Sequence, residues 1–303
     1  MVGIPQKFYR MHKIFLYIFC VFIAAGCSKE KVVVPDFEIS TESGTYKVGD
    51  TITFNFSGKP DNITFYSGEP GHNFDYRSRT VADNDLQIEF KTLVQYAVIY
   101  DNLKLLVSTD FNGIYSADNL KLATWTDISD RATFSAGQDN VSSGVISLKP
   151  YVRDNSLLYV AFHYTDYKKS QGQNRWIIRT FTADKISPEG VVSNLATMAT
   201  GGWKGISLLN STQVWTISST QLLMYGGTAA NEDNDDWVIS KGFDFQSVEP
   251  DLGIALKNVS TRLDSYQHVY TEPGTYKVVF EASSVRYNGE KRVVKELSLQ
   301  IMP

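Results

Sequence analysis

Cysteine is almost absent from this sequence, and the absence limits how the fold can be stabilised. The only cysteines among the 303 residues are Cys20 and Cys27. Cys20 lies inside the apolar N-terminal run, so the remainder of the chain has no pair of cysteines for an internal disulfide. Stability must therefore come from a hydrophobic core, which a composition of 43% hydrophobic residues can supply.

Motifs of familiar catalytic sites are also missing. The sequence contains no Gly-x-Ser-x-Gly, no His-Glu-x-x-His and no glycine-rich phosphate loop. His72, His163 and His268 are widely separated in the sequence, so a histidine metal site or a Ser-His-Asp relay would rest on scattered residues. We therefore expect a protein that is not an enzyme. A carboxylate pair for glycoside hydrolysis stays open, because its geometry depends on the fold.

Positive charge is not in excess. The net charge is −4, and the first 26 residues carry Lys7, Arg10 and Lys13 without any acidic residue, so the rest of the chain is more acidic still. Binding to nucleic-acid phosphates requires a basic face. We therefore expect no nucleic-acid partner.

Residues 1–26 have the layout of a secretory signal. A basic start is followed by an apolar run over residues 14–25 and by small residues directly before Cys27. The run is too short to span a membrane comfortably as a helix. Small residues before a cysteine resemble the bacterial lipobox, which implies cleavage before Cys27 and attachment of a lipid to it. The alternative is an ordinary signal with an incidental cysteine.

Residues 27–35 form a short charged and extended tether, in which Ser-Lys-Glu-Lys precedes Val-Val-Val-Pro. A charged motif directly after a lipidated cysteine resembles the signal that exports lipoproteins of Bacteroidota to the outer face of the outer membrane. The resemblance implies an outer-membrane protein that is held by a lipid anchor and exposed at the cell surface.

From residue 36 onward, apolar and polar residues alternate with the period of β-strands. Residues 52–56 and 276–280 each place three apolar side chains on one face, and Pro273-Gly274 is a turn dipeptide. Helical periodicity is absent from every long window. The sequence therefore predicts an all-β protein.

Three segments carry a recognisable strand pattern. They are Tyr-x-Val-Gly-Asp-x-Ile-x-Phe at 46–54, Ile-x-Phe-Tyr at 63–66 and Tyr-Thr-x-Pro-Gly-Thr-Tyr-x-Val at 270–278. Their order resembles the immunoglobulin-like (Ig-like) module of the polycystic-kidney-disease (PKD) type, in which these strands follow one another closely. The wide separation here predicts an Ig-like sandwich split by an inserted domain, which surface loops tolerate. The predicted boundaries are 36–76 with 264–303 for the sandwich and 77–263 for the insert.

The insert over residues 77–263 also has the pattern of short strands at irregular spacing, which favours a jelly roll or a similar double sheet. Ser-Thr-Asp-Phe-Asn-Gly at 108–113, Ala-Thr-Trp-Thr-Asp-Ile at 123–128 and Asn-Asp-Asp-Trp-Val-Ile-Ser at 234–240 resemble the galactose-binding-like jelly rolls of adhesin and choice-of-anchor domains. The predicted fold class is therefore an all-β, Ig-like sandwich split by a jelly-roll β-sandwich.

Over residues 36–303 the chain resembles a family of Bacteroidota lipoproteins built on a domain of unknown function, DUF5017. Members of that family are associated with outer-membrane glycan-uptake systems of the starch-utilisation type. The resemblance implies an accessory lipoprotein that binds extracellular glycan beside an uptake channel, and it brings no catalytic residues with it. The alternative is an adhesin or a structural partner of an outer-membrane complex without sugar binding.

The predicted sugar site is the loop between two strands at residues 163–176. Sugars are held by an aromatic face against their C–H groups and by amide, carboxylate or guanidinium contacts to their hydroxyls. The loop offers both kinds of residue: Tyr164, Asp166, Tyr167, Asn174 and Arg175. The alternative is a solvated hairpin tip with tyrosine packed at its base.

Trp203 is a further candidate for the sugar site, because glycines flank it at residues 200–205. Flexible flanks allow a tryptophan to stack on a sugar ring, and they equally allow it to fold back into the core. Trp125, Trp215 and Trp237 fall in strand patterns, so we expect them in the core.

Acidic residues at 231–236 form a candidate calcium site, together with a second loop that a jelly roll could bring nearby. Calcium binds oxygen ligands of this kind. The candidate ligands are Asp110, Asn112, Asp233, Asp235 and Asp236. The EF-hand pattern is not met, so a solvated acidic loop is the alternative.

Overall fold

The computed structural model describes residues 31–96, 99–152 and 156–303. Within these residues the regular elements are strands, apart from four 3₁₀ turns and one short α-helix, α2 (Ala117–Leu122). The prediction of an all-β protein is therefore confirmed, and within the described residues the named strands pair antiparallel except for β2 (Thr45–Lys47) with β20 (Gly289–Met302). In the described part of the chain, no helix has the length and apolar character needed to cross a membrane. The predicted lipidation site, Cys27, lies outside the described residues.

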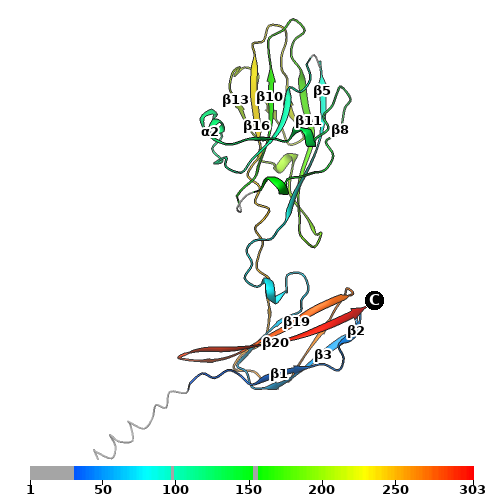
Figure 1. Cartoon of the computed structure of the whole chain (residues 1–303), viewed down its shortest axis with the longest axis vertical. Helices are drawn as coiled ribbons and strands as arrows, with labels where there is room; N and C mark the ends of the chain where they lie inside the picture. The colour runs from blue at the N-terminus through cyan, green and yellow to red at the C-terminus, as the bar shows by residue number, and fades with distance from the viewer. Residues whose placement is uncertain (1–30, 97–98, 153–155) are drawn as a thin grey trace, which may run out of the picture. The chain divides into compact units, whose positions relative to one another are not determined.

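The chain divides into two compact units (Figure 1). Unit 1 contains the described residues up to Ser78 together with Pro250–Pro303, and unit 2 contains Arg79–Glu249. Unit 1 is thus built from two pieces of sequence that are far apart. Strand β17 (Ile254–Lys257) belongs to unit 1, although it lies in the range that the sequence pattern assigned to the insert. Its four side chains are exposed or half-buried, so it carries no clear apolar alternation.

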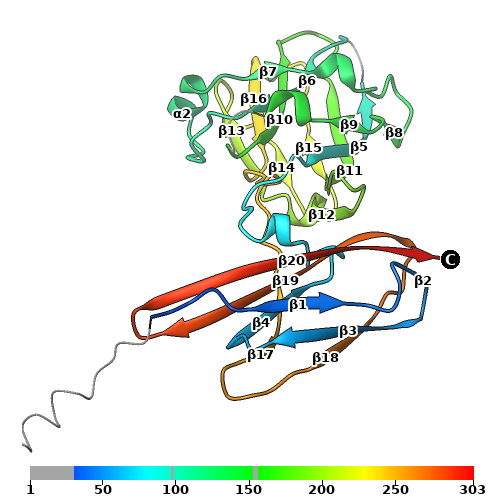
Figure 2. The ribbon, with the colours of Figure 1, turned by 60° about the horizontal axis from the view of Figure 1, so that its bottom comes forward.

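Unit 1 consists of two sheets, whose strands are labelled in Figure 2. The three-stranded sheet has the order β1 (Phe37–Ser40), β3 (Thr51–Gly58) and β18 (Ser265–Val269). The five-stranded sheet has the order β17, β4 (Asn62–Tyr66), β19 (Gly274–Arg286), β20 (Gly289–Met302) and β2 (Thr45–Lys47). Strands from before the insert therefore pair directly with strands from after it: β3 with β18, and β4 with β19.

The core of unit 1 joins aromatic side chains from both pieces of sequence. Phe54 of β3, Phe65 of β4 and Phe280 of β19 are fully buried, and their ring centroids lie 4.9 to 5.7 Å apart. These are the tilted and edge-to-face arrangements that aromatic rings prefer. Unit 1 therefore has no complete core until both pieces of sequence are present.

Unit 2 also has two sheets. The five-stranded sheet has the order β13 (Lys204–Ser207), β16 (Asn234–Ile239), β10 (Tyr159–Asp166), β6 (Leu103–Ser108) and β7 (Thr126–Asp127). The seven-stranded sheet runs β14 (Thr216–Ile217), β15 (Leu222–Met224), β11 (Arg175–Ile186), β5 (Asp85–Gln95) and β8 (Val141–Ser142), with β12 (Val192–Thr197) on β11 and β9 (Ile146–Ser147) on β5. The two sheets share one core, in which Phe90 of β5 contacts Phe162 of β10 edge to face, with centroids 4.9 Å apart.

The tryptophans allow the two cores to be followed separately, because all five of them lie in unit 2. We expect Phe280→Ala to lower the free energy of unfolding of unit 1 by roughly 3 to 5 kcal/mol, since it removes a fully buried ring. The unfolding of unit 1 should appear at lower denaturant in circular dichroism, which reports both units, while the transition in tryptophan fluorescence stays in place. The matched variant Phe90→Ala should shift the tryptophan transition instead. A tryptophan shift of the same size for both variants would contradict two separate cores.

Candidate functional site

Three loops of unit 2 lie together at one end of its two sheets. β5 ends at Gln95, opposite Arg175 at the start of β11, and β10 ends at Asp166, opposite Asn234 at the start of β16. Because these strands are antiparallel neighbours, the connections that follow β5, β10 and β15 emerge on the same side. We call this region the loop end of unit 2: residues 96, 99–102, 167–174 and 225–233.

Asp166 is the centre of a buried hydrogen-bond network at the loop end. Its carboxylate accepts hydrogen bonds of 2.8 to 3.2 Å from four groups: the N–H of Tyr167, the N–H of Asn174, the hydroxyl of Tyr164 and the amide of Asn102. It also forms an ion pair with Lys169, and both side chains are almost completely buried. Burial, reinforced by the adjacent Asp166, holds the pKa of Tyr164 well above its usual range. These donors and the ion pair offset the free-energy cost of removing the Asp166 carboxylate from water.

Asn102 and Asn174 connect this network to neighbouring residues. The Asn102 side-chain oxygen accepts from the amide of Asn174 at 3.0 Å and from the indole N–H of Trp176 at 2.8 Å. The Asn174 amide also donates to the Ile99 carbonyl at 2.6 Å. Asn102 thus holds the indole of Trp176 in place, and Asn174 holds the backbone at Ile99.

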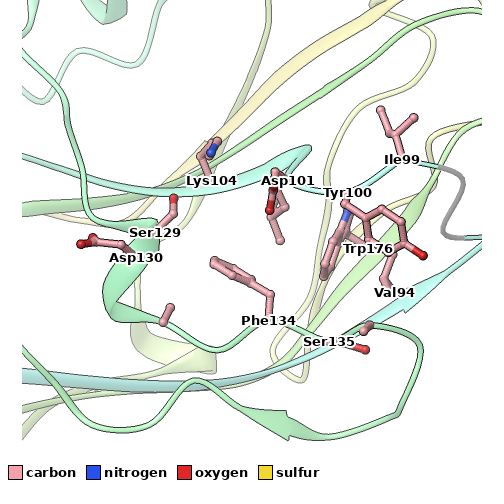
Figure 3. Close-up of a pocket in the computed structure, with 13 residues that line it drawn as sticks. Val94, Ile99, Tyr100, Asp101, Lys104, Ser129, Asp130, Phe134, Ser135 and Trp176 are labelled. Atoms are coloured by element: carbon pink, nitrogen blue, oxygen red, sulfur yellow. The ribbon is translucent and has the colours of Figure 1, made fainter.

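A cavity of about 490 Å³ opens beside these fixed residues (Figure 3). Its aromatic lining comes from Trp176, from Phe134, whose ring meets that of Trp176 edge to face at 6.1 Å, and from Tyr100, which is 75% exposed. The polar lining comes from Asp101, Lys104, Ser129, Asp130 and Ser135. A cavity of this size with aromatic walls and a few polar groups has the character of a small-molecule site.

Two residues at the loop end have backbone conformations that are uncommon outside glycine. Tyr96 has φ of 54° and Asp101 has φ of 60°. Aspartate tolerates the left-handed region better than tyrosine does, and such conformations persist only where the surroundings hold them. Asp101 lines the cavity, so the strained backbone lies at the candidate site.

Exposed tyrosines surround the loop end. Tyr96, Tyr100, Tyr167 and Tyr225 have between 48% and 75% of their surface exposed. The guanidinium of Arg175 lies 5.7 Å from the centre of the Tyr225 ring. Flat aromatic faces at the surface are available to a ligand larger than the cavity itself.

The structure separates the predicted sugar ligands into two groups. Tyr167 is exposed and Arg175 is half-buried, so both reach the surface of the loop end. Tyr164, Asp166 and Asn174 are buried inside the network, where they hold the loops and have no free face for a ligand. The sequence contained an indication of this burial. Tyr164 and Asp166 follow Phe162 at every second position along β10, so all three side chains point to the same, inner face.

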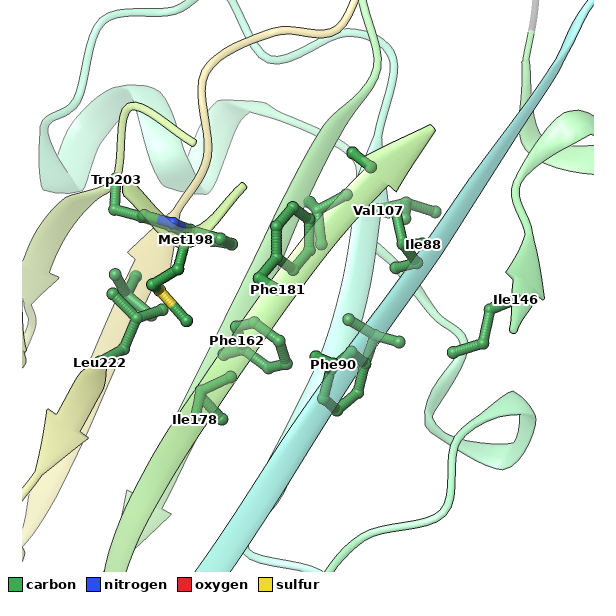
Figure 4. Close-up of a cluster of buried hydrophobic side chains, with 14 of the residues drawn as sticks. Ile88, Phe90, Val107, Ile146, Phe162, Ile178, Phe181, Met198, Trp203 and Leu222 are labelled. Carbon is green, nitrogen blue, oxygen red and sulfur yellow. The ribbon is translucent and has the colours of Figure 1, made fainter. Parts of the chain in front are cut away.

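Trp203, the remaining candidate, lies in the core of unit 2 (Figure 4). It is 6% exposed and meets Phe181 edge to face, with centroids 4.9 Å apart. Of the two interpretations of Trp203, the structure therefore shows the second: the flanking glycines let the tryptophan fold back into the core. Trp215 and Trp237 are buried as expected, and Trp125 is half-buried against Trp237.

The candidate calcium ligands do not gather in the structure. Each has another role: Asp110 accepts from Ser108 and Thr124, Asn112 donates to Asn119, Asp233 accepts from the N–H of Lys168, and Asp235 pairs with His163 at 2.8 Å. Across residues 31–96, 99–152 and 156–303, no group of three histidine, cysteine, aspartate or glutamate side chains could hold a metal ion.

Asp236, the fifth of these residues, is a buried carboxylate on β16. It is 1% exposed, and its two oxygens accept no hydrogen bond from the described residues. Burial raises the pKa of Asp236 to about 7; the nearby side chain of Ser207 opposes this rise, and the charge of the adjacent Asp235 adds to it. Asp236 therefore carries a proton over much of the acidic range.

This protonation makes stability depend on pH. Because the pKa of Asp236 is higher in the folded state than in the unfolded chain, its contribution is complete below about pH 4 and is lost as the pH rises through about 7. We expect the free energy of unfolding to fall by up to about 3 kcal/mol from this group between pH 5 and pH 8. Asp236→Asn should remove that fall. Urea unfolding followed by tryptophan fluorescence checks this, and equal pH dependence of both proteins would contradict it.

Comparison with models of protein families identifies the family of this chain. The family described as domain of unknown function (DUF5017) matches residues 26–203, which is more than half of the chain and includes every residue that lines the cavity. A search of curated proteins finds no match. The chain belongs to the DUF5017 family.

Proposed function

We propose that the protein is a non-catalytic surface lipoprotein that binds extracellular glycan at the loop end of unit 2. The cavity formed by Tyr100, Phe134 and Trp176 carries this proposal. Sugar rings pack their C–H groups on aromatic faces, and their hydroxyls bind carboxylate and ammonium groups such as those of Asp101 and Lys104.

The hydrogen bonds that hold the aromatic wall of the cavity in place favour binding. Trp176 is held by Asn102, which is itself part of the network around Asp166. A wall that is fixed before the ligand arrives loses little conformational entropy on binding. The exposed tyrosines outside the cavity extend the aromatic surface, which suits a polysaccharide better than a single sugar.

The cellular setting of the proposal comes from the sequence. We propose that residues 1–26 are a signal peptide, that Cys27 carries the lipid, and that the protein assists a polysaccharide uptake channel at the outer membrane of a member of the Bacteroidota. We also propose a PKD-type Ig-like module for unit 1 and a jelly roll for unit 2. The two sheets around one core in each unit support these assignments.

A second candidate function is adhesion to a neighbouring protein without sugar binding. The four exposed tyrosines at the loop end favour it, because tyrosine is enriched at protein interfaces. Capture of an outer-membrane protein that is unaffected by changes in the cavity would support this alternative.

Glycan arrays and calorimetry test the leading proposal. Both cores are formed by residues after 36, so a chain lacking residues 1–30 keeps them. We expect Tyr100→Ala and Phe134→Ala each to weaken saccharide binding by roughly tenfold or more. Leu122→Ala, which removes an apolar side chain about as exposed as Tyr100 but outside the cavity, should leave binding unchanged. Melting curves confirm that each variant folds, and absence of saccharide binding by the parent chain would refute the proposal.

Asp101 and Asp130 line the same cavity, so hydrolysis can be tested directly. We expect no release of reducing ends from polysaccharides that bind, and we expect Asp101→Asn to weaken binding without another effect. Release that either Asp101→Asn or Asp130→Asn abolishes would instead identify a glycoside hydrolase.

A further inference from the structure

One end of unit 1 gathers the start of the described chain and three turns. β1 begins at Phe37, opposite Gly58 at the end of β3, and β4 begins at Asn62, opposite Ser283 near the end of β19. The β3–β4 turn, the β17–β18 loop and the tip of the β19–β20 hairpin therefore lie at the same end. Figures 1 and 2 both show the start of the described chain beside the hairpin tip. We call this region the tether end: residues 31–37, 57–62, 257–265 and 284–292.

The N-terminal segment passes close to the hairpin tip. A side chain at Gly289 would lie 3.9 Å from Cγ1 of Val32, so these two positions are neighbours. At Gly58 a Cβ atom would lie 1.8 Å from the carbonyl oxygen of Asp36, and φ there is +94°. Only glycine permits this close passage of the chain into β1. Cys27 precedes Lys31 by four residues, which span about 14 Å at most when extended.

Basic residues outnumber acidic ones at the tether end, although the whole chain is negative. Seven side chains are basic: Lys31, Lys59, Lys257, Arg262, Arg286, Lys291 and Arg292. Four are acidic: Asp36, Asp61, Asp264 and Glu290. Within the described residues, Lys31, Lys59 and Lys291 form no ion pair. Their charges are available to an external anion.

Exposed apolar side chains accompany this charge. Val33, Val34, Val259 and Tyr287 have between 57% and 73% of their surface exposed. Tyr287 occupies the turn of the hairpin and thus projects from its tip. Tyrosine favours the boundary between water and lipid, because its ring is apolar and its hydroxyl is polar.

A cavity of about 330 Å³ lies at the tether end, with Val259 in its lining. Phe37, Phe56 and Ile63 supply apolar lining, and Lys59 supplies positive charge. Arg262 also lines the cavity, but it pairs with Asp264 at 2.9 Å, and Asp61 and Asp264 add negative charge. Lys257 also lines it, but its ammonium already donates to three backbone carbonyls, of Pro60, Asp61 and Asn258. The cavity therefore combines an apolar surface with one cationic group, Lys59, that has no ion pair within the described residues and can bind phosphate.

We propose that the tether end binds an anionic lipid surface, with Tyr287 in the interfacial layer and Lys59 and Lys291 on lipid phosphates. This inference rests on the proposed lipid anchor at Cys27, which holds the tether end within reach of the membrane. A basic and aromatic surface strengthens attachment by a lipid anchor, because each Lys or Arg adds attraction to anionic headgroups. The docked surface belongs to unit 1 alone and shares no residue with the loop end of unit 2.

Sedimentation with lipid vesicles tests the proposal on the chain lacking residues 1–30. We expect binding to vesicles of phosphatidylglycerol and phosphatidylcholine, weaker binding as salt increases, and none to phosphatidylcholine alone. Lys59→Glu combined with Lys291→Glu should lower the partition coefficient by roughly tenfold or more, and Tyr287→Ala should lower it by a smaller factor. The matched control is Lys47→Glu, because Lys47 is exposed on β2 at the other end of β20.

Two outcomes overturn the inference: no binding to anionic vesicles by a folded chain, or an equal loss for Lys47→Glu. The anchor is tested separately by fatty-acid labelling of the full chain in cells, with Cys27→Ser as its control. Labelling of Cys27 without vesicle binding overturns the docking surface and leaves the proposed function intact. Vesicle binding without labelling supports the docking surface and removes the anchor.

Discussion

The pairing of β4 with β19 is the constraint on which the rest of the structure depends. It places Phe65 opposite Phe280 and so closes the core of unit 1 with residues from both sides of the insert. The segment that leaves unit 1 and the segment that comes back to it after unit 2 must therefore lie close together. Hydrogen bonds from Asp251 to Tyr76 and from Leu252 to Gly71 hold the outgoing and returning segments together in unit 1. In unit 2 the bridge between Val81 and Ser247 does the same.

A different constraint organises unit 2. The carboxylate of Asp166 is removed from water, which is favourable only because hydrogen-bond donors and Lys169 surround it. Supplying those donors fixes the backbone of the loop after β10 and, through Asn102, the position of Trp176. Polar residues that look like sugar ligands in the sequence thus form the support of the site, and the aromatic lining of the cavity comes from elsewhere.

The sequence predicted the strands well, because alternation reports directly which side of a strand is buried. The residues 52–56 and 276–280 do lie in β3 and β19, and their apolar side chains face one core. The strand β17 was missed because its pairing with β4 buries little apolar surface.

The cavity was not predictable in the same way. Tyr100, Phe134 and Trp176 belong to three separate segments, and only the pairing of β5 with β11 and the path of the chain before β8 bring them together. Likewise, the burial of Tyr164 depends on the second sheet that covers β10. A loop sequence shows which groups are present, whereas the partners across the core decide which of them are exposed.

The discontinuity of unit 1 also sets an order for folding during synthesis. Unit 2 is complete once Glu249 has emerged, since all of its strands precede that residue. The strands β3 and β4 are made much earlier, yet their partners β18 and β19 arrive last. Phe54 and Phe65 therefore remain uncovered while the whole of unit 2 is made, and exposed apolar strands of this kind are prone to aggregate. The strands that are synthesised first are thus the last to complete their core. They stay exposed until the C-terminal hairpin leaves the ribosome.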